Sequence, residues 1–315
     1  MLFDYETLRV IWWLLLGVLL IGFAIMDGFD MGVAMLLPVM TESDAEKRIL
    51  INSVGPVWEG NQVWFILGGG AIFAAWPPLY ATAFSGFYVA MFLILAALIL
   101  RPVGFKFRSK LDNPTWRRLW DLALFLGGAV PALVFGVAVG NVLQGVPFHF
   151  NEDLLPVYEG GFFGLLNPFA LLCGLLSVTL LVTQGAAYLS VKTVGDLRER
   201  ARRWVQRGGL ASILLFALGG LWLAWGIESY AIAGEIDTNG PSNPLVKEVV
   251  RAEDGWFANY ALRPWTMIAP LLGFLGALAA IALARAGWAL TAFVASSTAI
   301  FGVISTVGLA MFPFI

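Results

Sequence analysis

The strongest constraint on the fold is a succession of apolar runs, each long enough to cross a lipid bilayer. About 20 predominantly apolar residues in a helix span the hydrocarbon core of a membrane. The sequence therefore predicts an all-α fold, a polytopic transmembrane helical bundle with about eight membrane-spanning helices. The predicted spans are approximately Val10–Met40, Val57–Ala75, Tyr80–Leu100, Leu119–Leu143, Phe162–Tyr188, Leu210–Trp225, Trp265–Leu283 and Trp288–Phe312.

Composition supports a lipid environment. Hydrophobic residues make up 59% of the 315 residues and charged residues only 13%, whereas a soluble domain is roughly half apolar and a quarter charged. The net charge of −2 gives no support for a nucleic-acid partner. Asp4, Glu6 and Arg9 precede the first span without a basic leader, so we expect a retained helix rather than a signal peptide. With no repeat or linker in evidence, residues 1–315 are expected to form a single integral membrane domain.

Lysine and arginine gather in two connections, and such loops stay in the cytoplasm. The connections at 101–118 and after Tyr188 are therefore predicted to be cytoplasmic. Acids dominate the alternate connections, which are predicted to face outward together with the N-terminus. These acids are Glu152, Asp153 and Glu159, and, within Glu228–Arg263, Glu235, Asp237, Glu248, Glu253 and Asp254.

Ionisable residues interrupt the apolar runs at one side of the predicted membrane. Asp27 and Asp30 lie in the first span, Glu59 and Gln62 begin the second, and Arg101 ends the third. Asp27 and Asp30 are three residues apart, as are Glu59 and Gln62, so the two members of each pair share a helix face. Charged groups inside a membrane segment cost about 2.5–3.5 kcal/mol each on insertion scales, which makes them candidates for function. Buried acids with an amide and an arginine are the components of a proton relay.

A structural alternative stays open for the same residues. The first apolar run is longer than the bilayer core, so Asp27 and Asp30 could lie at the interface, with Arg101 reaching the headgroups from its helix end. Glu59 fits this alternative less well, because Trp58 and other polar or amphipathic neighbours surround it.

The chain is poor in metal ligands. Its one histidine, His149, falls in a predicted outward loop, and its one cysteine, Cys173, falls in the middle of a span. Heme and copper sites need such residues together in the bundle core, so we expect no metal or redox cofactor bound by this chain. Gly68-Gly69-Gly70 is interpreted as a place of close helix packing.

Eight motifs follow one another along the chain, from the first span to the last residues. The motifs are Arg9-Val10-Ile11-Trp12-Trp13-Leu14-Leu15, Asp27-Gly28-Phe29-Asp30-Met31-Gly32, Trp58-Glu59-Gly60-Asn61-Gln62-Val63-Trp64, Phe84-Ser85-Gly86-Phe87-Tyr88, Arg101-Pro102-Val103-Gly104-Phe105, Gly140-Asn141-Val142-Leu143-Gln144-Gly145-Val146-Pro147-Phe148, Thr183-Gln184-Gly185-Ala186 and Met311-Phe312-Pro313-Phe314. In their order and spacing they closely resemble subunit II of cytochrome bd-type quinol oxidases.

The resemblance implies a multi-pass protein of the bacterial inner membrane and a partner, subunit I, which carries heme b, heme d and the loop where quinol is oxidised. This chain would be the non-heme subunit, with a small single-helix accessory subunit and a structural quinone as further partners. The acid at the position of Glu59, commonly Asp in the family, belongs to a proton pathway towards the oxygen-reducing heme. Asp27, Asp30 and Arg101 lie nearby, and we interpret Trp58 and Gln62 as organising this cluster.

Two departures from the family pattern qualify these expectations. Lys106 stands where many members have an acid, so protons could be taken up through Glu42, Asp44 or Glu46 instead. The resemblance also implies one more C-terminal helix after Phe314.

Two other functions remain open at this stage. Buried acids beside an arginine suit a stand-alone proton-coupled transporter or channel equally well. A scaffold that only shields the heme subunit is the third interpretation.

Overall fold

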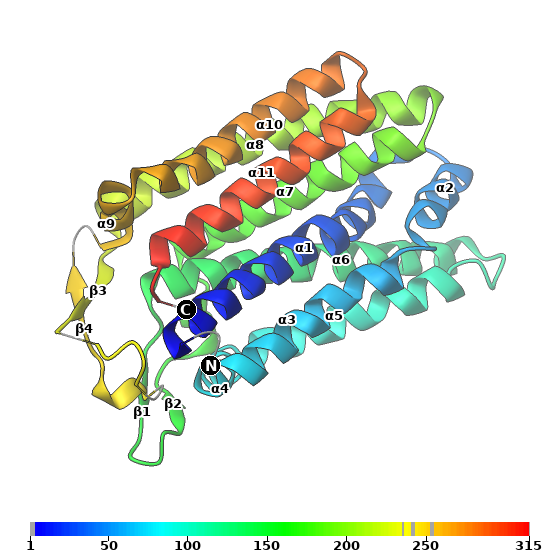
Figure 1. The fold of residues 1–315 in the computed structure, drawn as a ribbon. Coiled ribbons are helices and arrows are strands. Elements are labelled where there is room, and N and C mark those ends of the chain that lie inside the picture. Colours follow the sequence, from blue (N-terminus) through cyan, green and yellow to red (C-terminus); the bar gives the residue numbers. More distant parts are fainter. Residues whose placement is uncertain (1–3, 235, 241–242, 253–254, 315) are drawn as a thin grey trace.

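The computed structural model describes residues 4–234, 236–240, 243–252 and 255–314. Long helices dominate it (Figure 1). The α-helices are α1 (Tyr5–Met40), α2 (Asp44–Val54), α3 (Trp58–Ala75), α4 (Pro77–Gly86), α5 (Tyr88–Phe107), α6 (Pro114–Gln144), α7 (Pro168–Lys192), α8 (Gly195–Gly226), α9 (Gly255–Leu262), α10 (Ile268–Arg285) and α11 (Ala289–Met311). Short 3-10 helices are η1 (Phe162–Leu165), η2 (Pro244–Val246) and η3 (Pro264–Met267).

Two small antiparallel sheets complete the secondary structure. Strand β1 (Phe148–Phe150) pairs with β2 (Pro156–Tyr158), and β3 (Ser229–Ala233) pairs with β4 (Glu248–Ala252). Both sheets and α9 lie at one end of the bundle, with the two termini of the chain (Figure 1). We call this the strand end. The opposite end, with α2 and the turns α5–α6, α7–α8 and α10–α11, is the α2 end.

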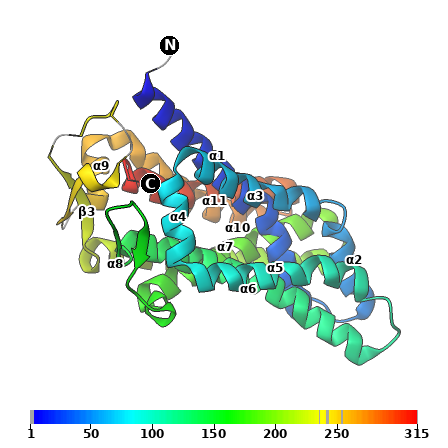
Figure 2. The same cartoon turned by 90° about the horizontal axis from the view of Figure 1, so that it is seen from below.

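The long helices form two adjoining groups. Helices α7, α8, α10 and α11 form one group, and α1, α3, α5 and α6 form the other. The groups are joined by α6, which packs on α7, and by α1, which packs on α7 and α11. Figure 2 shows α4 crossing from the end of α3 to the start of α5. Residues 27–37 of α1 are all buried, so its second half lies at the centre of the protein.

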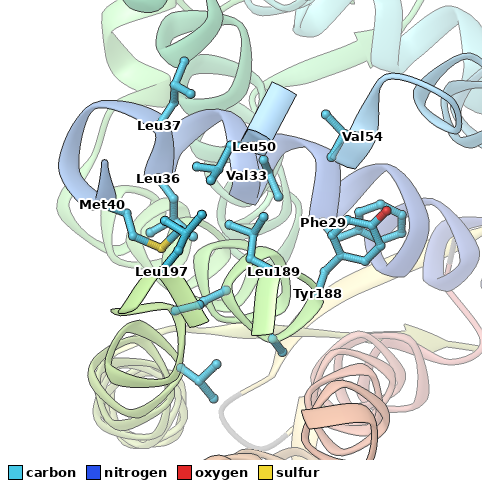
Figure 3. Packing of buried hydrophobic residues seen from close by; sticks show 14 of the residues in the cluster. Phe29, Val33, Leu36, Leu37, Met40, Leu50, Val54, Tyr188, Leu189 and Leu197 are labelled. Carbon is cyan, nitrogen blue, oxygen red and sulfur yellow. The ribbon is translucent and has the colours of Figure 1, made fainter. Parts of the chain in front are cut away.

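Glycines set the closest helix contacts around α1. A Cβ added to Gly32 would lie 2.0 Å from the carbonyl oxygen of Leu181 and 2.9 Å from the Gly185 backbone, so α1 and α7 touch through their backbones. Small residues permit such approach between membrane helices. The main apolar cluster lies beside this contact, towards the α2 end. Figure 3 shows its labelled members, which are Phe29, Val33, Leu36, Leu37, Met40, Leu50, Val54, Tyr188, Leu189 and Leu197.

The predicted class is confirmed, with about eight long helices. Among the described residues, seven helical segments are long and apolar enough to span a membrane. The eighth predicted run corresponds to α3, which is 18 residues long and has the polar residues Glu59, Asn61 and Gln62 near its start.

Several boundaries were wrong. The run Tyr80–Leu100 is divided at Phe87 between α4 and α5, and the first cytoplasmic connection contains the helix α2. The basic residues after Tyr188 lie mostly on α8, which begins at Gly195 rather than Leu210. The strands were not predicted. The outward acids Glu235, Glu253 and Asp254 lie outside the described residues.

Candidate functional site

Asp27 and Arg101 form a closed ion pair inside the bundle. Arg101 Nη1 donates to Asp27 Oδ1 at 2.9 Å, and Nη2 donates to Oδ2 at 3.0 Å. Both residues are 0% exposed. The bidentate geometry matches the fork of the guanidinium to the carboxylate. Arg101 lies within α5 and is buried against Asp27 instead of reaching outward from a helix end, which argues against the interfacial alternative for this pair.

The α6 backbone makes room for this pair. A Cβ on Gly127 would lie 2.8 Å from Arg101 Cγ, and one on Gly128 would lie 2.6 Å from the Met31 carbonyl oxygen. Two consecutive glycines thus bring α6 against both α5 and α1. Sequence reasoning singled out Gly68-Gly69-Gly70 instead, yet an added Cβ at any of these three would meet no described atom within 4 Å. The expected close packing at those glycines is therefore absent within the described part of this chain.

Asp30 occupies a different environment one turn further along α1. Its Oδ2 accepts a hydrogen bond from Asn61 Nδ2 on α3 at 2.9 Å, while its buried Oδ1 has no hydrogen-bond partner among the described residues. Asp30 is 0% exposed and Asn61 5% exposed. The adjacent Phe29 stacks on Tyr188 of α7, with ring centroids 4.2 Å apart (Figure 3). The site thus combines a neutralised pair with a carboxyl that has no cation of its own.

Glu59 does not join this buried set. It is exposed in the first turn of α3, where an acid suits the positive end of the helix dipole. No hydrogen bond or ion pair links it to another described residue. Asn61, named in the sequence only as a polar neighbour, makes the bond to Asp30 because it lies on the buried face of α3. The structure brings Asp27 and Arg101 into contact, with Asp30 one turn along α1, whereas Glu59 makes no hydrogen bond or ion pair with them, so its part in the cluster remains a prediction.

Trp58 and Gln62 are both partly buried. The ring of Trp58 packs near that of Phe105 on α5, with centroids 5.6 Å apart. Trp58 therefore helps to hold α3 against α5 near the site. Gln62 makes no hydrogen bond to any described side chain, so its organising role remains a prediction.

A second charged cluster, at the α2 end, was missed. Arg108 donates to Asp121 from Nε at 2.5 Å and to Asp44 from Nη2 at 2.6 Å, and Lys47 Nζ lies 2.8 Å from Asp121 Oδ2. Arg117 adds a 3.1 Å contact to Asp44. A signal was present in the sequence, because Asp121 is an acid inside a predicted span. We call these five residues the α2-end network.

The acids considered for proton uptake are already paired with arginines. Glu42 and Glu46 contact Arg200, and Asp44 contacts Arg108. The hydrogen bond from Arg108 lowers the pKa of Asp44, and the backbone N–H of Glu42 lowers the pKa of Glu46. Because both stay ionised at neutral pH, this pairing argues against Asp44 and Glu46 as proton-loading groups.

The described residues contain no group of three or more His, Cys, Asp or Glu side chains placed to hold a metal ion. His149 lies on β1 with Nδ1 3.0 Å from Glu159 Oε1. Cys173 is partly buried on α7 as a free thiol. These two residues occupy separate elements and share no site.

The family model for cytochrome bd terminal oxidase subunit II matches residues 8–315. The chain belongs to that family. It is 53% identical over 312 residues to cytochrome bd-I ubiquinol oxidase subunit 2 of Escherichia coli, an alignment that covers 99% of this chain and 82% of the relative. The Bacillus subtilis cytochrome bd ubiquinol oxidase subunit 2 is 36% identical over 232 residues, covering 73% of this chain and 67% of the relative.

A solved structure shares the fold. The bd oxidase from Geobacillus thermodenitrificans matches with a TM-score of 0.70 at 20% sequence identity, covering 98% of this chain and 86% of that chain. The chain is therefore a multi-pass membrane subunit of a terminal oxidase, an oxidoreductase of the electron-transport class. The stand-alone transporter was the wrong alternative.

Proposed function

We propose that this chain is the non-heme subunit of a quinol:oxygen oxidoreductase and supplies a proton pathway to it. Quinol oxidation and oxygen reduction take place in subunit I, on heme b and heme d. The relatives named as ubiquinol oxidase subunits support a quinol as donor. The protons consumed in making water pass through this subunit from the cytoplasm, which contributes to the proton motive force.

The observation that carries the proposal is the contrast between the two buried aspartates. The charges of Asp27 and Arg101 cancel in a closed pair. An ionised Asp30 beside them would be an isolated buried charge, which is costly unless it is paired. Asp30 is therefore the buried acid suited to hold and pass on a proton, with one oxygen held by Asn61 and the other free of a described partner. Asp27 and Arg101 position it and set the local field.

Glu59 is assigned to the outer part of the same pathway. Asn61 links Asp30 to α3, and Glu59 lies two residues earlier on the exposed side of that helix. An exposed acid on a long helix in a membrane bundle needs a polar partner or water. Subunit I is the proposed partner on this face, where Gly69 and Gly70 also leave space for close approach. Trp58 and Gln62 flank Glu59 and orient it.

Oxygen consumption and proton uptake by the assembled oxidase in vesicles test the pathway. We expect Glu59→Gln and Asp30→Asn to lower turnover about tenfold or more while heme content stays normal. Glu152→Gln, an exposed acid at the strand end, is the matched control and should retain turnover. If Glu59→Gln and Asp30→Asn both keep wild-type turnover with heme intact, the pathway is wrong and the cluster is structural.

The proposal also includes the orientation of the chain in the membrane and further partners. The gathering of basic residues at the α2 end supports a cytoplasmic location for that end, with the N-terminus on the outer side of the bacterial inner membrane. A single-helix accessory subunit and a structural quinone complete the proposed complex. An apolar groove of about 430 Å³ between α7 and α8, lined by residues such as Leu172 and Trp222, is the candidate place for the quinone tail.

A further inference from the structure

The α2 end carries a basic surface on α8 and α10 that the proton pathway does not use. Six cations lie between Lys192 and Arg207, against the two acids Asp196 and Glu199. Arg200 is paired with Glu42 and Glu46 of the α1–α2 region, and Arg202 with Glu199. Glu199 is therefore engaged by another arginine, and Asp196 forms no ion pair with any described residue.

Four arginines of this region have no acidic partner among the described residues, and one of them, Arg198, donates to the Thr193 carbonyl oxygen instead. Of the other three, Arg203 and Arg207 are exposed and lie one turn apart on the same face of α8. Arg285, exposed at the end of α10, is held towards α8 because its Nε donates to Gln206 Oε1 at 3.3 Å. Helix α8 packs on α10 (Figure 1), and the bond between Arg285 and Gln206 places the end of α10 beside the turn of α8 that carries Arg203 and Arg207.

The surroundings of these arginines are typical of a membrane interface. Arg207 lies over the ring of Trp204 at 5.8 Å, and Trp288, just after α10, is 64% exposed. Tryptophan gathers at the level of the lipid headgroups. Leu210 and Leu214 continue the Arg203–Arg207 face of α8 towards the middle of the membrane, and each is more than half exposed.

We propose that Arg203, Arg207 and Arg285 form a binding site for an anionic phospholipid of the membrane. The guanidinium groups bind the phosphate of the headgroup, and the acyl chains lie along Leu210 and Leu214. Basic pockets between transmembrane helices on the cytoplasmic side suit such headgroups, and arginine binds phosphate oxygens through paired N–H donors. The proposal is independent of the proton pathway.

Native mass spectrometry of the delipidated, assembled oxidase tests the site, with phosphatidylglycerol as the probe. The triple variant Arg203→Gln, Arg207→Gln, Arg285→Gln should bind it at least tenfold more weakly, since each arginine near an anionic lipid surface contributes about fivefold. The triple Arg→Lys variant at these positions keeps the charges but loses the paired donors, so its binding should fall between that of wild type and that of the glutamine variant. Phosphatidylcholine should bind weakly to all forms, and inorganic phosphate should not compete.

The matched control removes three exposed cations from the same end of the molecule, at the α5–α6 turn: Lys106→Gln, Lys110→Gln, Arg118→Gln. It should bind phosphatidylglycerol within about threefold of wild type, because less than one arginine's contribution is at stake. Equal losses in the two triple variants would overturn the site in favour of a general charge effect. Unchanged phosphatidylglycerol binding in the arginine-to-glutamine triple variant would also overturn it. So would burial of these three arginines under another subunit of the assembled oxidase.

Discussion

Arg101 lies in α5, and Arg108 caps the C-terminal end of that helix two turns further along. Each is at most 1% exposed, yet the two arginines are held differently. Arg101 has a single carboxylate partner, Asp27, which is 0% exposed. Arg108 shares Asp121 with Lys47 and also reaches Asp44, whose side chain is 50% exposed. The comparison teaches that burial of an arginine alone does not determine how costly its loss is.

The difference lies in what remains when one charge is removed. When one residue of the closed pair is substituted, the other is left as an uncompensated charge in a medium of low dielectric constant. The loss of folding stability is then far larger than the contribution of the pair itself. A shared network leaves a second partner in place, and its exposed members can be solvated by water. We therefore expect the inner pair to be intolerant of single changes and the α2-end network to be tolerant.

The largest effect is expected for Arg101→Leu. The substitution strands the Asp27 carboxylate inside the bundle, and we expect it to cost about 3–5 kcal/mol of unfolding free energy. Thermal unfolding of the solubilised oxidase, with heme content as a second readout, measures this loss. The control is Arg101→Leu combined with Asp27→Leu, which removes both charges and should recover much of the stability. A single variant as stable as the double would contradict the closed-pair description.

The matched change Arg108→Leu should be less damaging. Lys47 still compensates Asp121 at 2.8 Å, so the loss is limited to charge-assisted hydrogen bonds, about 1–3 kcal/mol. Adding Lys47→Leu removes that second partner, and the combined loss should approach that of Arg101→Leu. If Arg108→Leu alone is as harmful as Arg101→Leu in the same unfolding assay, sharing of Asp121 gives no protection.

The sequence predicted the buried site of Asp27, Asp30 and Arg101 better than the α2-end network, for a physical reason. Asp27, Asp30 and Arg101 interrupt or end apolar runs, so their cost in lipid distinguishes them from the other charged residues of the sequence. Arg108 lies in a stretch rich in basic residues, where the distribution of charge indicates sidedness but not which side chain turns inward. Its partner Asp121 was passed over because it stands near the start of a span, where an acid is common.

The sequence could not predict which side chains contact one another across helices, because this depends on how each helix is rotated about its axis and on how closely neighbouring helices approach. Gly127 and Gly128 fix how closely α6 meets α5 and α1, and glycines elsewhere in the sequence look equally suitable. The orientation of α3 decided that Asn61, rather than Glu59, points at Asp30. Successive residues on a helix differ by about 100° in direction. The closeness of Glu59 and Asn61 in the sequence therefore could not show which of them faces Asp30.

A smaller effect is expected for Asp44→Asn, at the exposed margin of the α2-end network. Half-exposed ion pairs contribute about 0–1 kcal/mol, and we expect a loss in that range in dilute buffer. At about 1 M salt the Debye length falls to about 3 Å, so wild type and variant should then unfold at nearly the same temperature. Asp27→Asn is the contrast, since its destabilisation should persist in salt. A salt-independent loss in Asp44→Asn would mean that Asp44 acts as a buried group.

The smallest effect concerns pH at the same margin. The hydrogen bond from Arg108 lowers the pKa of Asp44 below its ordinary value of 3.8. A carboxyl whose pKa is lower in the folded state contributes stability above its unfolded pKa and loses it as pH falls through the folded value. The stability difference between wild type and Asp44→Asn should therefore be constant from neutral pH to about pH 5 and shrink below about pH 4. Unfolding temperatures of both proteins across this range measure the difference. A stability difference that already declines between pH 7 and pH 6 would show that Arg108 does not hold the Asp44 carboxylate in its ionised form. The contrast with the closed Asp27–Arg101 pair would then have no electrostatic basis.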